Sequence, residues 1–405
     1  MVKREGLGPA FANLFTANLA SSLGDGIART AIPLLGARLT TDPLLIAGLA
    51  ALALLPWLFF AIPAGILVDR IDRRTALALA QAVRTALGIL LVVLVATESL
   101  TIWWLYLVIF VYGAFETVYD GAIRAVVPSI VGKANLPRAN SRIEGGELVV
   151  QNFIAGPATS ALFAVAVLIP LGINGLVFAV AGALALLLPR AASGRQFAAA
   201  TSDEPVVPWY RQFADGLRFI MGNPMLRTLW FFATFCGLMT TAATASYVLF
   251  LLGPLGVPEA FYGVFLLSGA IGGILGAVIT DPVKRRRGSG LTMALASCLV
   301  GVSFLIIGFL PTVWASAVGY ALSSLAITVW NVLMMSLRQS VIPGRLLGRV
   351  HGTWRTLLWG TLPLGAIIGG LVARVDLALP FLVFGGLELL GSLLFFRFVM
   401  TLPNP

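Results

Sequence analysis

The chain has 405 residues, of which 59% are hydrophobic and 11% are charged, and its formal net charge is +10. A soluble domain carries about one quarter charged residues, so this composition excludes a soluble globular protein. The basic residues stand in short runs between apolar stretches, which argues against a nucleic-acid-binding surface. The sequence contains one histidine, no phosphate-binding loop and no metalloprotease motif, so we expect neither enzymatic activity nor a metal or cofactor.

Apolar runs of about 20 residues, each long enough to cross a hydrocarbon core of about 30 Å, recur along the chain. In chain order, the predicted spans are 10–36, 43–68, 75–97, 101–127, 143–166, 168–189, 225–252, 257–280, 289–310, 312–336, 353–374 and 378–400. The sequence therefore predicts an all-α membrane protein with twelve transmembrane helices.

The longest polar interruption divides these spans into two groups of six. We expect residues 1–190 to form the first six-helix bundle, 191–224 a cytoplasmic linker and 225–405 the second bundle. The second and eighth spans end in similar segments, 65–69 and 276–281, each followed by basic residues, which indicates two pseudo-symmetric halves. Within the linker, apolar residues recur at helical spacing over 209–220 and predict an amphipathic helix on the inner membrane surface.

Lys and Arg are distributed unequally between the two sides of the predicted membrane protein. Placing the N-terminus in the cytoplasm puts most of the 27 Lys and Arg residues inside, and only Arg38 and Arg374 outside. The positive-inside rule therefore predicts a protein of the cell membrane with both termini in the cytoplasm.

Charged residues within the spans are the strongest functional signal, because each costs at least about 2.5–3.5 kcal/mol at a helix centre and needs a partner or a water-filled cavity. The carboxylates at such positions are Asp25, Glu116, Asp120 and Glu147, with Arg29 and Arg124 as predicted charge partners. We expect the four carboxylates to be candidates for proton coupling. The alternative is that Asp25 pairs permanently with Arg29, and Asp120 with Arg124, as packing devices. The role of Glu388 is open.

Several residues of the second half have simpler interpretations. Glycines at 269, 272, 273 and 276 predict close packing of the eighth helix. Trp330 and Asn331 either line a substrate cavity or pack between helices. His351 lies in a basic loop, where we expect it to be solvated.

Residues 65–74, Gly-Ile-Leu-Val-Asp-Arg-Ile-Asp-Arg-Arg, resemble the major facilitator signature between the second and third helices, with Asp72 at a position usually held by glycine. Further segments resemble the bacterial drug:proton antiporter group that includes the enterobactin and macrolide exporters. They are 23–26 (Leu-Gly-Asp-Gly), 137–140 (Pro-Arg-Ala-Asn), 156–157 (Gly-Pro) and 347–350 (Leu-Gly-Arg-Val). The resemblance covers nearly the whole chain.

This resemblance implies a monomeric secondary transporter whose partners are a small-molecule substrate, protons and the lipid bilayer. Its function would be proton-coupled efflux of drugs, natural products or siderophores by alternating access. An importer or a lipid flippase is the alternative. The cytoplasmic gate would consist of Gly65, Asp69, Arg70, Arg73 and Arg74, acting against the helix near Gly352. The substrate cavity candidates are Gln151, Trp330 and Asn331.

Overall fold

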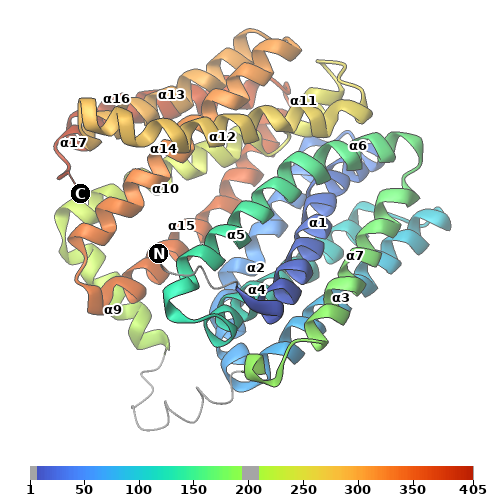
Figure 1. The fold of residues 1–405 in the computed structure, drawn as a ribbon. Helices are drawn as coiled ribbons and strands as arrows, with labels where there is room; N and C mark the ends of the chain where they lie inside the picture. Colours follow the sequence, from blue (N-terminus) through green and yellow to red (C-terminus); the bar gives the residue numbers. More distant parts are fainter. Residues whose placement is uncertain (1–6, 194–208, 405) are drawn as a thin grey trace. The chain divides into compact units, whose positions relative to one another are not determined.

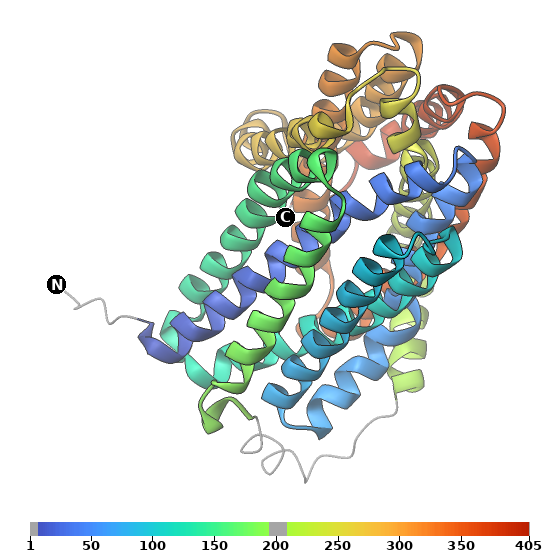
Figure 2. The same cartoon turned by 90° about the vertical axis from the view of Figure 1, so that its right-hand side faces the viewer.

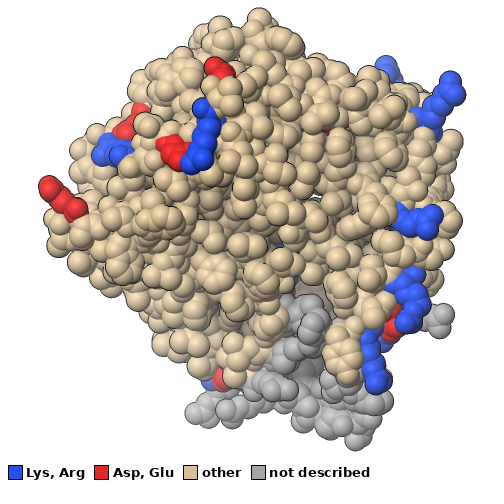
Figure 3. Space-filling view, turned by 180° about the vertical axis from the view of Figure 1, so that it is seen from behind, with Lys and Arg blue, Asp and Glu red and all other residues tan. Residues whose placement is uncertain are grey.

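The computed structural model describes residues 7–193 and 209–404, and the regular structure of these residues is helical throughout (Figure 1). Ten of the described helices are long and apolar enough to cross a membrane, and α16 is a shorter apolar helix. The first helix, α1, is long but more polar. Its polar side chains Asn18, Ser21 and Asp25 are buried within the protein, so α1 need not present them to lipid. Uncharged side chains cover most of the face shown in Figure 3, as expected for a surface in contact with lipid.

The helices of the first half follow the predicted spans closely. They are α1 (Gly8–Leu39), α2 (Pro43–Arg70), α3 (Arg73–Ala96), α4 (Ile102–Ile130), α5 (Leu136–Leu148), α6 (Gly156–Val165) and α7 (Leu168–Leu186). The fifth span consists of α5, a π-helical turn η2 (Val149–Ala155) and α6, which form one continuous rod (Figure 2).

The second half contains α9 (Trp209–Gly222), α10 (Pro224–Thr244), α11 (Tyr247–Leu252), α12 (Glu259–Arg287), α13 (Ser289–Phe309), α14 (Val313–Val341), α15 (Gly344–Ala373), α16 (Leu379–Leu394) and α17 (Phe396–Met400). The predicted linker helix is present as α9, and it packs on α15. Arg349 forms an ion pair with Asp215 at 3.3 Å, and the Thr353 hydroxyl donates to the carbonyl of Phe213 at 3.2 Å. The placement of α9 on the inner membrane surface remains a prediction.

The chain divides into two compact units. The first contains Met1–Leu35, Leu55–Val206 and Glu259–Gly263, and the second contains Gly36–Leu54, Val207–Pro258 and Val264–Pro405. This division differs from the predicted boundaries at 190 and 224, because the first half of α2 packs with the second unit. There the small side chains of Ala47 and Ala51 contact Ala245 and Ala366. The linker helix α9 also belongs to the second unit.

Helix α12 packs closely against α14 through glycines, as predicted. A Cβ atom at Gly272 would overlap the main-chain carbonyl of Ala321, whereas one at Gly273 would lie 3.4 Å from the Thr328 hydroxyl. We therefore expect Gly272→Ala to destabilise the protein by about 1–3 kcal/mol, because the two backbones must separate. Gly273→Ala is the matched control, since alanine there gains helix propensity of up to about 1 kcal/mol without a clash. Thermal unfolding in detergent measures both, and equal melting temperatures would contradict the packing interpretation.

An ion pair in the second unit connects the α1–α2 loop to the end of α15. The Arg374 guanidinium donates from Nε to Asp42 Oδ1 at 2.8 Å and from Nη2 to Oδ2. The hydrogen bond from Arg374 holds the pKa of Asp42 below its ordinary value. The pKa of Asp42 is therefore lower in the folded state than in the unfolded state, so the ion pair stabilises the fold at pH values above the ordinary aspartate pKa. This stabilisation is lost as the pH falls through the lowered pKa.

Asp42→Asn should therefore lower the melting temperature at pH 7, and this difference from the wild type should shrink as pH falls below the ordinary aspartate pKa of about 3.9. Asp376→Asn is the control, because each of the two aspartates caps a helix start: Asp42 accepts from the Leu44 amide at 2.9 Å, and Asp376 accepts from the Ala378 amide at 2.7 Å. If the melting temperature of Asp42→Asn stays equally far below that of the wild type at low pH, the ion pair is not the cause of the difference.

Candidate functional site

A buried ion pair joins α1 to α3 in the first unit. The Asp25 carboxylate pairs with the guanidinium of Arg84, and the Tyr112 hydroxyl of α4 donates to Asp25 Oδ1 at 2.6 Å. Arg84 is fully buried and Asp25 is 8% exposed. The prediction that Asp25 pairs with Arg29 is wrong, because spacing along one helix could not reveal a cation supplied by another helix.

Aromatic rings enclose the Arg84 guanidinium. Its Cζ atom lies 4.4 Å from the ring centroids of Tyr112 on α4 and Phe178 on α7. Arg84 Nη1 also donates to the Ser21 hydroxyl at 3.2 Å. Four helices of the first unit thus meet around one cation. Sequence reasoning assigned Arg84 no role, although an arginine inside an apolar span was the signal that could have found it.

Glu116 occupies a more open position in the same cluster. Its Oε1 lies 3.8 Å from Nη2 of Arg29, and the two side chains are 20% and 65% exposed, respectively. Arg29 is therefore a charge partner, as predicted, but of Glu116 on α4 rather than of Asp25.

Glu147 joins the cluster from the fifth span. Asn18 Nδ2 donates to Glu147 Oε1 at 2.8 Å, and the Tyr119 hydroxyl donates to Asn18 Oδ1 at 3.3 Å. One turn further, the backbone of Gln151 lies against Gly26 of α1, where a Cβ would be 2.9 Å from the Gln151 Cα. Gln151 thus belongs to a close contact between α1 and η2.

The Asp120 and Arg124 side chains form the predicted pair, at 4.0 Å along α4. They are 39% and 78% exposed. This pair is therefore more open to the surroundings than Asp25 and Glu116, and contributes little to holding helices together.

The basic residues of the signature segment fasten the start of α3 to neighbouring helix ends. Asp72 caps α3 by accepting from the Arg74 amide at 2.9 Å, which gives this aspartate a structural role. Arg74 Nη1 donates to the Leu188 carbonyl at 3.1 Å, and Arg73 Nη1 donates to the Ala125 carbonyl at 2.8 Å. Gly65 lies within α2, with open space at its Cα. The side chains of Asp69 and Arg70 lie outside the described part of the chain, so the gate remains a prediction.

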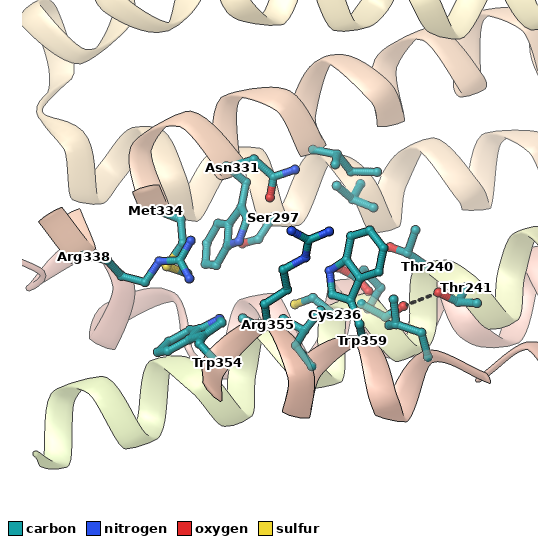
Figure 4. Close-up of a pocket in the computed structure, with 18 of the residues that line it drawn as sticks. Cys236, Thr240, Thr241, Ser297, Asn331, Met334, Arg338, Trp354, Arg355 and Trp359 are labelled. Carbon is teal, nitrogen blue, oxygen red and sulfur yellow. Dashed lines mark hydrogen bonds between the residues drawn. The ribbon is translucent and has the colours of Figure 1, made fainter. Parts of the chain in front are cut away.

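The second unit encloses a cavity of about 480 Å³ (Figure 4). Its walls come from α10, α13, α14, α15 and α16. Both Trp330 and Asn331 line it, and their role in binding substrate remains a prediction. His351 also lines the cavity and is half-buried. It lies on α15, which begins at Gly344, so the expectation of a loop residue is wrong.

Three further polar residues of this cavity, Arg338, Arg355 and Glu388, had no predicted binding role. The guanidinium of Arg338 lies 5.1 Å from the ring centroid of Trp354, and that of Arg355 lies 4.8 Å from that of Trp359. Glu388 is 1% exposed, and its Oε2 has no hydrogen-bond partner among the described residues. The cavity therefore combines indole rings with fixed charges.

A family model described as a transmembrane secretion effector, within the major facilitator superfamily, matches residues 8–404. The chain belongs to this family. Among curated relatives, the multidrug efflux pump Tap of Mycolicibacterium fortuitum is 27% identical and covers 93% of this chain and 94% of its own length. Macrolide efflux protein A of Streptococcus pyogenes is 22% identical and covers 93% of both chains.

Solved structures show the same fold. The nucleoside transporter NupG aligns with a TM-score of 0.74 at 14% identity, covering 97% of this chain and 100% of its own. A bacterial homologue of the iron transporter ferroportin, in its inward-facing state, aligns with a TM-score of 0.76 at 17% identity, covering 98% and 100%. This major facilitator protein is thus a multi-pass membrane transporter rather than an enzyme, and the predicted two-bundle, twelve-helix fold is confirmed.

Proposed function

We propose that this major facilitator protein is a proton-coupled exporter of amphipathic or hydrophobic small molecules, working by alternating access in the cytoplasmic membrane with both termini in the cytoplasm. The names of the relatives support efflux, since both aligned relatives are described as efflux proteins. The concentration of Lys and Arg in alternate loops supports the orientation.

The observation that carries proton coupling is the contrast between two carboxylates of the first unit. A residue that carries a proton during each cycle must be reachable by water and must lose its charge without leaving a buried counter-charge. Asp25 does not meet this condition, because protonating it would leave the fully buried Arg84 uncompensated. We assign Asp25 and Arg84 to a fixed ion pair.

Glu116 meets both conditions. It is partly exposed, and its counter-ion Arg29 is 65% exposed, so Arg29 remains solvated when Glu116 takes up a proton. An arginine at this depth faces water rather than lipid, because a lipid-exposed guanidinium would be costly. Protonation of Glu116 would release Arg29 and loosen the contact between α1 and α4, which links the proton to helix movement. Asp120 and Glu147 remain secondary candidates for this role.

Everted membrane vesicles from cells with and without the protein test the direction and the driving force. Respiration acidifies the lumen of such vesicles, so an exporter exchanging protons should accumulate at least one of two labelled amphipathic probes there, erythromycin or fluorescein. Nigericin together with valinomycin in potassium buffer, which collapse both the pH gradient and the membrane potential, should abolish the accumulation. Accumulation that survives this combination would contradict proton coupling, and accumulation only in right-side-out vesicles would identify an importer.

A further inference from the structure

The cavity of the second unit presents positive charge beside indole rings. Its lining includes the cations Arg338 and Arg355, together with His351, on the facing helices α14 and α15. In Figure 4 the guanidinium of Arg355 points into the cavity, between Asn331 and Trp359. Each guanidinium stacks on an indole ring, which fixes its position at little further entropic cost on binding.

The acidic residue of this lining is recessed. Glu388 is 1% exposed, whereas Arg338, Arg355 and Trp359 are only partly buried. A ligand entering the cavity therefore meets guanidinium groups, indole faces and the Asn331 amide before it meets the carboxyl group. The volume of about 480 Å³ lies within the range of about 300–1,000 Å³ that is typical of small-molecule sites.

We infer that this cavity selects planar aromatic molecules that carry an anionic group, such as a carboxylate, over cations of the same shape. The anion would accept charge-assisted hydrogen bonds from Arg355 or Arg338, and the aromatic body would stack on Trp359 and Trp330. Asn331 would add a neutral hydrogen bond at the cavity wall. This inference rests on the proposed transport function and specifies the class of substrate that the second unit of the protein binds.

Binding to the purified full-length protein in detergent tests the inference with two probes on one xanthene frame, the anion fluorescein and the cation rhodamine 123. Fluorescence anisotropy, corrected for binding to empty micelles, should show fluorescein binding at least about 10-fold more tightly. Loss of one charge-assisted hydrogen bond in Arg355→Gln should weaken fluorescein binding by about 10-fold or more. The control Arg397→Gln, which removes an exposed arginine outside the cavity, should change neither probe's affinity.

Asn331→Asp provides a second test that keeps side-chain size and Arg355 intact. It should weaken fluorescein binding and strengthen rhodamine 123 binding, because it adds a carboxylate to the cavity wall. Equal or tighter binding of rhodamine 123 by the wild type, or no response of fluorescein to either substitution, would overturn the inference. The assay measures equilibrium binding without a gradient, so its outcome does not depend on proton coupling. Failure of proton coupling is therefore distinguishable from failure of anion selection.

Discussion

Replacing Glu116 with glutamine should reduce uphill transport driven by a pH gradient to background, while exchange of substrate across the membrane without a gradient persists. The amide has nearly the shape of the carboxylate but cannot exchange a proton. The contact to Arg29 is only 3.8 Å long and partly exposed, so its loss should leave the fold intact. Proteoliposomes with and without an imposed pH gradient measure the two activities separately.

Glu144→Gln is the matched control, because Glu144 is exposed on α5 of the same unit. It should transport like the wild type under both conditions. Uphill transport by Glu116→Gln at the wild-type rate would transfer the coupling role to Asp120 or Glu147, whose amide variants belong in the same assay. Loss of exchange as well as uphill transport would show that Glu116 serves transport in a different way from proton exchange.

Replacing Asp25 with asparagine should destabilise the folded protein by about 3–5 kcal/mol, because it leaves a buried arginine without its counter-charge. Arg84 is fully buried, and its guanidinium is held between Tyr112 and Phe178, so water cannot reach it in the native state. The expected result is a much lower melting temperature and a smaller monodisperse fraction in detergent.

The double variant Asp25→Asn with Arg84→Gln tests whether the uncompensated charge of Arg84 causes the loss of stability. It removes both charges and should recover part of the lost stability, since no uncompensated charge remains buried. Normal stability of Asp25→Asn alone would show that Arg84 finds another partner or that the pair opens to water. In that case Asp25 would return as a proton-coupling candidate beside Glu116.

Local patterns of amino acids were enough to predict the class of the protein and most of its helices. Runs of apolar residues about 20 long fix where helices cross lipid, because in the absence of water each backbone polar group must bond within its own segment. The amphipathic spacing over 209–220 likewise predicted α9, and the glycines of the eighth span predicted its close packing against a neighbour. These signals are local, since each depends on the residues of a single helix.

Which charged side chains meet depends on how the helices pack against one another. Asp25 and Arg29 share a helix at a spacing that favours pairing, yet the partner of Asp25 is Arg84 on α3, and the partner of Arg29 is Glu116 on α4. The same holds for the cavity, where Arg355 and Asn331 come together from α15 and α14. A periodic pattern shows which face of a helix is polar, but the free energy of a buried charge depends on the atoms that neighbouring helices bring within a few ångströms of it.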